Sequence, residues 1–266
     1  MRIALVSLDQ IWADKEANIS RCKKFVTSAL AASCNTIIFP EMTLTGYSLD
    51  AQKICESIDD SITLRWFSDL ASKSRINIVF GAVLSNQESS MPSNALCLAM
   101  SNGQSRVIYR KIHPFSYAQE NEYYMAGADL NLMKVDDVLM APAICYDLRF
   151  PEIFSAIASR VQLILVIANW PKKRLEHWYA LLRARAIENQ CFVVGVNRIG
   201  MDGNGIEYQK SSIIFSPQGD AVKPKSVGYE MDIYQLDIAE VAKYRDEFPT
   251  IKDKRYSLYR DLFEGL

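Results

Sequence analysis

Short, continuous apolar runs alternate along this chain with segments whose apolar residues recur at helical spacing. Residues 36–39 and 163–168 are runs of the first kind, whereas 15–32, 61–74 and 175–189 are segments of the second. A strand that is apolar on both faces must be covered on both. An amphipathic helix can cover one of them with its own apolar face. The alternation therefore predicts an α/β fold in which helices cover buried sheets. It is compatible with one sheet or with two.

The same two patterns place the other elements. Ser61 precedes its helical segment as an N-cap, and Ser101-Asn102-Gly103 forms a hairpin turn between strands at 94–100 and 106–110. Further strands are expected at 2–8, 76–83, 138–145, 192–196, 212–215 and 231–236, with short helices beginning at 151 and spanning 239–244. No linker, repeat or low-complexity segment interrupts the chain, so we expect residues 1–266 to form a single domain.

Charge and hydropathy narrow the class of partner. The 30 basic and 31 acidic residues leave a formal net charge of -1, so no overall field attracts nucleic acid or an anionic membrane. The apolar stretch 161–170 is too short to cross a bilayer, and Asp9 ends the apolar start of the chain before a signal peptide could form. We therefore expect a small-molecule partner, with no nucleic acid and no membrane.

The cysteines point to a reducing compartment. Six of them are scattered along the chain without a CxxC pair, and only two histidines are available to complete a metal site. This pattern predicts reduced thiols, a cytoplasmic location and no metal or other cofactor.

Three polar residues follow three predicted strands at the point where each strand ends. Cys145 ends the run 138–145, Glu41 follows 36–39 and Pro40, and Lys111 follows 106–110. Each has an ordinary explanation on its own, as a small buried thiol, a surface glutamate or a solvated lysine. Because α/β folds present their chemistry at the carboxyl ends of strands, the three together supply the nucleophile, base and cation that open an amide.

The segments around these residues resemble the nitrilase superfamily, the carbon-nitrogen hydrolases. The three signature segments occur in the family's order as Phe39-Pro40-Glu41-Met42, Tyr109-Arg110-Lys111-Ile112-His113 and Cys145-Tyr146-Asp147-Leu148-Arg149-Phe150-Pro151-Glu152, and the resemblance continues through 168–171, 183–190 and 203–205. It implies a four-layer αββα sandwich of two mixed sheets with outer helices, in which Glu41, Lys111 and Cys145 converge. It also implies a homodimer.

Two segments are most similar to the omega-amidase branch: Asn169-Trp170-Pro171 with His177-Trp178, and the run 198–205. Omega-amidases hydrolyse the terminal amide of 2-oxo dicarboxylic acid monoamides such as 2-oxoglutaramate and 2-oxosuccinamate. The same catalytic set also serves other small-amide, nitrile and N-carbamoyl hydrolases, and a nitrilase fold that has lost its chemistry could act as a binding module. One departure from the family is Gln209-Lys210-Ser211-Ser212, where Gly or His often stands beside the serine.

The resemblance assigns roles that suit the residues' chemistry. An ordinary thiol has a pKa of about 8.5, so Cys145 needs a base, Glu41, and a stabilising cation, Lys111. Lys111 and the backbone N–H of Tyr146 would hold the oxyanion. Glu120 matches a second glutamate of the family, with Glu122 as its nearby competitor. A cysteine-histidine pair with His113 or His177 is the rival arrangement.

The substrate-binding residues are less determined. Tyr47 and Trp170 follow strands and could wall a small pocket that also contacts Tyr146, and Arg149 is our candidate for the substrate's far carboxylate. Other cations remain open for that role, namely Lys172, Lys173, Arg174 and Arg185. Arg149 could equally form a structural pair with Asp147 or Glu152, and Arg183 and Arg185 could be charges on the surface of a helix.

Overall fold

Two mixed β-sheets form the centre of the computed structural model, which describes residues 1–85 and 91–265. The first sheet has the order β14-β15-β1-β2-β4-β5-β6, with β3 paired to β4, and the second has the order β13-β10-β9-β8-β7. The strands of the first are β1 (Arg2–Val6), β2 (Thr36–Ile38), β3 (Glu56–Ser57), β4 (Asn77–Ser85), β5 (Ser93–Ala99), β6 (Ser105–Arg110), β14 (Ser226–Val227) and β15 (Met231–Gln235). Those of the second are β7 (Met133–Val135), β8 (Val138–Ile144), β9 (Leu163–Ala168), β10 (Phe192–Asn197) and β13 (Ile213–Phe215).

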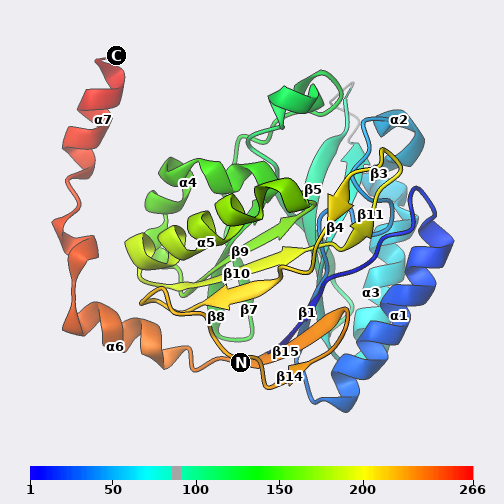
Figure 1. Ribbon diagram of the computed structural model, residues 1–266, viewed down its shortest axis with the longest axis horizontal. Coiled ribbons are helices and arrows are strands. Elements are labelled where there is room, and N and C mark those ends of the chain that lie inside the picture. Colours follow the sequence, from blue (N-terminus) through cyan, green and yellow to red (C-terminus); the bar gives the residue numbers. More distant parts are fainter. Residues whose placement is uncertain (86–90, 266) are drawn as a thin grey trace.

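The sheets pack face to face, and helices cover their outer faces (Figure 1). In β1, Ile3 and Leu5 point into the core shared by both sheets, whereas Ala4 and Val6 pack with α1 (Lys15–Ala31) and α3 (Ile62–Ser74). The outer face of the second sheet packs against α4 (Pro151–Ser155) and α5 (Leu175–Asn189). Each central strand is therefore apolar on both faces, and the expected αββα sandwich is confirmed.

The longer elements lie where the sequence predicts them. Helix α5 has the predicted bounds, and α3 begins after Ser61, whose side chain accepts a hydrogen bond from the N–H of Leu64. Helix α6 (Ala239–Glu247) runs three residues beyond the predicted end at 244. The sequence interpretation missed the short elements, which are α2 (Ala51–Ile54), β3, β7, β11 (Gly200–Met201), β12 (Glu207–Tyr208) and β14. Segments of two to four residues are too short to show a period.

The C-terminal segment was also not anticipated. After α6, a 3₁₀ helix (Thr250–Asp253) and α7 (Tyr256–Glu264) extend beside α4, away from the N-terminus (Figure 1). Tyr259, Leu262 and Phe263 of α7 are exposed, and they line an apolar groove with α4. Homodimerisation stays a prediction.

All six cysteines are free thiols. Among the described residues, no helix has the length and the apolar composition that crossing a membrane requires.

Parallel strands bring several strand ends to one edge of the sandwich. In the first sheet β1, β2 and β4 are parallel, and in the second β8, β9 and β10 are parallel. The turn after β2 lies directly on β4 at Gly81, where an added Cβ would come within 2.3 Å of the Met42 backbone nitrogen. Glycine at this position therefore lets the segment that carries Glu41 pack against the sheet.

A partly buried carboxylate, that of Glu56, joins α1 to α3 and allows a test of the fold. Glu56 accepts hydrogen bonds from Lys15 Nζ at 2.6 Å and from the backbone N–H of Thr63 at 2.9 Å, and it also bonds Ser61. Burial alone would raise the pKa of Glu56, but these bonds outweigh it and lower the pKa from 4.5 to about 2.

Because the pKa of Glu56 is depressed in the folded state, its stabilisation is present above pH 4.5 and is lost as pH falls toward 2. We expect Glu56→Gln to lower the free energy of unfolding at neutral pH by about 3 kcal/mol, and the difference from wild type to shrink across that acid window. Urea denaturation at a series of pH values measures this. Glu16→Gln, at an exposed glutamate of α1, is the control. A pH-independent difference would contradict the prediction.

Candidate active site

Four residues that are far apart in the sequence meet at the shared edge of the two sheets. Glu41 lies after β2, Lys111 directly after β6, Glu120 at the start of a 3₁₀ helix (Glu120–Glu122), and Cys145 directly after β8. Lys111 Nζ lies 3.2 Å from Glu41 Oε1 and 2.7 Å from Glu120 Oε2. Both glutamates are 0% exposed and Lys111 is 1% exposed, so the ammonium and its carboxylates form a buried cluster.

Two asparagines complete the cluster. Asn94, on β5, donates from Nδ2 to Glu41 Oε1 at 2.7 Å and to Glu120 Oε1 at 3.2 Å. Asn169, after β9, donates its backbone N–H to Glu41 Oε2 at 2.8 Å, and its carbonyl accepts from Cys145 Sγ at 3.8 Å. Neither had been assigned a role from the sequence. The sequence signal for both asparagines was a polar residue beside an apolar strand. A buried amide requires hydrogen-bond partners, so such a residue marks a candidate contact.

Cys145 occupies a strained turn. Its φ is +47°, in the left-handed region that non-glycine residues rarely adopt, and it joins β8 to the 3₁₀ helix η4 (Cys145–Arg149). A sharp turn between a strand and a helix presents a nucleophile away from the sheet. The residue after Glu41, Met42, also has a φ of +47°, so both turns at this edge have unusual backbone geometry.

The buried charges set the protonation of the thiol. Burial raises the pKa of Cys145 well above its ordinary value, Glu41 raises it further, and Lys111 opposes them. Burial alone would lower the pKa of Lys111, but Glu120 and Glu41 outweigh it and the pKa lies well above its ordinary range. One ammonium already faces two carboxylates, so a resting thiolate would add a further buried negative charge. Transfer of the thiol proton to Glu41 leaves the total charge unchanged.

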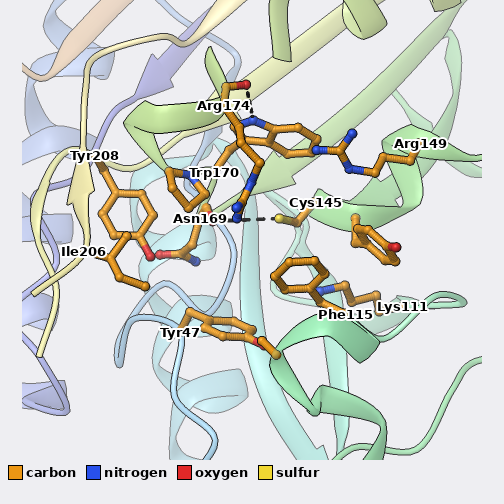
Figure 2. Close-up of a pocket in the computed structure, with 13 residues that line it drawn as sticks. Tyr47, Lys111, Phe115, Cys145, Arg149, Asn169, Trp170, Arg174, Ile206 and Tyr208 are labelled. Atoms are coloured by element: carbon orange, nitrogen blue, oxygen red, sulfur yellow. Dashed lines mark hydrogen bonds between the residues drawn. The ribbon is translucent and has the colours of Figure 1, made fainter. Parts of the chain in front are cut away.

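A small cavity of about 80 Å³ opens beside Cys145, and Figure 2 shows the side chains around it. The four predicted substrate-binding residues, Tyr47, Tyr146, Arg149 and Trp170, all line it. Other lining side chains were not predicted, namely Phe115, Ile206 and Tyr208. One water needs roughly 10–15 Å³ of cavity volume measured in this way. The cavity therefore suits a small molecule.

Two arginines lie against aromatic walls of the cavity. The Arg149 guanidinium lies 4.8 Å from the Trp170 ring centroid, and that of Arg174 lies 5.5 Å from the Phe115 ring (Figure 2). Burial and the charge of Arg174 lower the pKa of Arg149. In the part of the chain that the structure describes, neither arginine forms an ion pair with a carboxylate. The pair can therefore attract an anionic group of a ligand.

Comparison with known proteins places this site in a family. A model of the carbon-nitrogen hydrolase family matches residues 2–246. The chain belongs to the carbon-nitrogen hydrolases. Omega-amidase YafV of Escherichia coli is 32% identical over 95% of this chain and 96% of its own, and the 2-oxoglutaramate amidase of Bacillus subtilis is 31% identical over 97% and 98%. A solved structure of XC1258 from Xanthomonas campestris, described as a CN-hydrolase superfamily protein, superimposes with a TM-score of 0.88 at 30% identity and covers 96% of this chain and 97% of that one.

The structure of this hydrolase also shows which of the basic residues considered for carboxylate binding lie away from the cavity. Arg185 is neither a surface charge nor part of the cavity, because it is 4% exposed and donates to the Leu148 carbonyl and to Glu188. Lys172 pairs with Glu207 at 2.7 Å, and Lys173 is exposed outside the cavity lining. Arg183 is exposed, as expected.

Several alternative pairings do not occur among the residues that the structure describes. Arg149 does not pair with Asp147, whose carboxylate contacts Tyr109 and His113 instead. His177 Nδ1 contacts Arg149 at 3.4 Å, so the hydrogen bonds of both histidines run to groups other than Cys145.

The structure also distinguishes Glu120 from Glu122 and places the segment 209–212. Glu122 is exposed, whereas Glu120 is buried against Lys111. Near the family departure at 209–212, Lys210 pairs with Asp232 at 2.7 Å and does not line the cavity.

The electrostatics of the cluster can be tested without a substrate. Since Glu41 raises the pKa of the Cys145 thiol, we expect Glu41→Gln to lower that pKa and to shift the pH midpoint of Cys145 alkylation by iodoacetamide to lower pH. Mass spectrometry of the Cys145 peptide measures the midpoint. Glu122→Gln, at the exposed glutamate two residues from Glu120, serves as the matched control and should leave it unchanged. An unchanged or higher midpoint in Glu41→Gln would contradict the arrangement of charges.

Proposed function

We propose that this hydrolase is an omega-amidase, which converts 2-oxo dicarboxylic acid monoamides such as 2-oxoglutaramate and 2-oxosuccinamate to the 2-oxo acid and ammonia. One observation carries the proposal: a thiol and an ammonium that bonds a buried carboxylate line the same small cavity as two arginines without carboxylate partners among the described residues. The names of the Escherichia coli and Bacillus subtilis relatives support the same class of reaction.

The first half of the reaction would form a thioester. Cys145 Sγ attacks the amide carbon as its proton passes to Glu41, and a C–S bond forms. The oxyanion is held by the Lys111 ammonium and by the backbone N–H of Tyr146, in the first turn of η4. Glu41 then gives the proton to the leaving nitrogen, the C–N bond breaks, and ammonia departs.

The second half would return the enzyme to its starting state. Water attacks the thioester carbon while Glu41 accepts its proton, and a C–O bond forms. The C–S bond then breaks as Glu41 returns that proton to Cys145 Sγ, which restores the thiol and releases the acid. Glu120 contacts Lys111 Nζ with both oxygens, at 3.0 and 2.7 Å, and so orients the ammonium throughout.

The other end of the substrate suits the rest of the cavity. Arg149 and Arg174 supply planar guanidinium groups that bind a carboxylate in two-point fashion, and Trp170 and Phe115 support them. The phenol oxygen of Tyr47 is buried and has no hydrogen-bond partner among the described residues. Burial raises the pKa of Tyr47, so its hydroxyl remains a donor, which suits the 2-oxo group.

The competing activities use the same catalytic residues, so substrate preference separates them. We expect ammonia release to be fastest, in kcat/KM, with 2-oxoglutaramate or 2-oxosuccinamate in a panel that includes glutamine, an N-carbamoyl amino acid and a nitrile. Cys145→Ala should abolish release. Preference for a nitrile or a carbamoyl compound would instead favour another hydrolase of the superfamily. A wild-type protein inert toward every compound would favour a binding module.

The two arginines should affect only substrates that carry a carboxylate at the end far from the amide. We expect Arg149→Met and Arg174→Met each to raise KM for 2-oxoglutaramate about tenfold or more, because a hydrogen bond to a charged group contributes about 1.5–3 kcal/mol. Activity toward butyramide, which has no carboxylate, should change little. Arg183→Met, at an exposed arginine on α5, is the control. Equal losses on both substrates would argue against carboxylate recognition.

A further inference from the structure

We propose that Asp147 is a positioning residue for the amide hydrolysis, and that it holds the turn carrying Cys145 against the segment carrying Lys111. This inference rests on the proposed function, because it assumes that Cys145 and Lys111 act on the same amide. Asp147 lies two residues after Cys145 in η4, is 0% exposed, and does not line the cavity.

Both oxygens of the Asp147 carboxylate are bonded, and the partners come from both sheets. Oδ2 accepts from the backbone N–H of Ile144 at 3.0 Å and from Tyr109 Oη at 2.8 Å. Oδ1 accepts from the backbone N–H of His113 at 2.9 Å and contacts His113 Nδ1 at 2.9 Å. Ile144 is next to Cys145, whereas Tyr109 and His113 stand two residues before and after Lys111.

The hydrogen bond between Ile144 and Asp147 spans Cys145, the strained residue proposed as the nucleophile. It runs from the residue before Cys145 to a side chain two residues after it, so the carboxylate closes a loop around the residue with φ of +47°. A residue persists in that conformation only where the surrounding structure holds it. Asp147 therefore stabilises the turn that directs the thiol toward the cavity.

The bonds to Tyr109 and His113 anchor Lys111 on both sides. Tyr109 Oη also accepts from the N–H of Ile112 at 3.3 Å, and the His113 ring stacks on Phe150 with 3.8 Å between centroids. In the described part of the chain, no hydrogen bond joins Cys145 to Lys111 directly. The carboxylate is thus a direct tie between the backbone segments that carry the nucleophile and the cation.

The position of Lys111 matters because oxyanion stabilisation falls steeply with distance. Displacement of a catalytic group by 1 Å can lower a rate about 100-fold. In Asp147→Asn the side chain keeps its size but retains one acceptor oxygen for the donors of Ile144, Tyr109 and His113. We therefore expect kcat for 2-oxoglutaramate to fall about 100-fold while KM changes less than about threefold, because the cavity lining is retained.

A second readout needs no substrate. Because Lys111 lowers the pKa of the Cys145 thiol, a looser tie should move the pH midpoint of Cys145 alkylation in Asp147→Asn to higher pH. The control is the same substitution at another buried aspartate, Asp232. This residue is 5% exposed, and its carboxylate accepts a hydrogen bond from Lys210 Nζ at 2.7 Å. Asp232→Asn should lower stability but change neither kcat nor the midpoint.

A normal kcat in a folded Asp147→Asn protein, a loss confined to KM, or an unchanged midpoint would overturn the proposal. If Asp147→Asn fails to fold, Tyr109→Phe tests the same tie by removing the hydroxyl that bonds Asp147 and Ile112, and we expect a kcat about tenfold lower. A wild-type kcat in Tyr109→Phe would then overturn it. If the wild-type protein hydrolyses no amide, the proposed function fails, but the alkylation midpoint still tests whether Asp147 couples the two segments.

Discussion

The buried contact of Lys111 with Glu41 and Glu120 is the interaction on which the rest of the site depends. An ammonium removed from water is costly unless carboxylates compensate it, and here two of them do so within 3.2 Å. The three residues come from three segments, so the cluster forms only when the first sheet and the loop after it are assembled. Burial and the charge of Glu41 raise the pKa of the Cys145 thiol, and the charge of Lys111 opposes them.

The packing of one sheet on the other brings Cys145, the proposed nucleophile, to this cluster. Cys145 and Asn169 belong to the second sheet, and Glu41 and Lys111 to the first, with the shared apolar core between them. Polar contacts then refine the placement at the edge of that core. Asn169 bonds Glu41 across the interface, and Asp147 bonds the segment that carries Lys111. The core thus sets the approach of the sheets, and the hydrogen bonds set the positions of the reacting groups.

The residues proposed to recognise the substrate lie on elements separate from these. Arg149 and Arg174 project from helical turns that follow β8 and β9, and Tyr208 belongs to the small β11–β12 hairpin. The ion pair of Lys172 with Glu207 joins that hairpin to the 3₁₀ turn that carries Arg174. Because these segments lie outside the sheets, their side chains can differ between related hydrolases without disturbing the cluster around Lys111.

The sequence by itself determined the long elements and the candidate reacting groups, because a period of two or 3.6 residues shows which faces are apolar and a polar residue after a strand marks its end. On this basis α5 was predicted to its bounds, and Cys145, Glu41 and Lys111 were selected. Tertiary structure decided what no local period contains: that Asn94 bridges two carboxylates, and that Arg174 faces the cavity whereas Arg185 of α5 is buried against the Leu148 carbonyl. These features are contacts between segments distant in the chain, so only the packing of the whole fold could specify them.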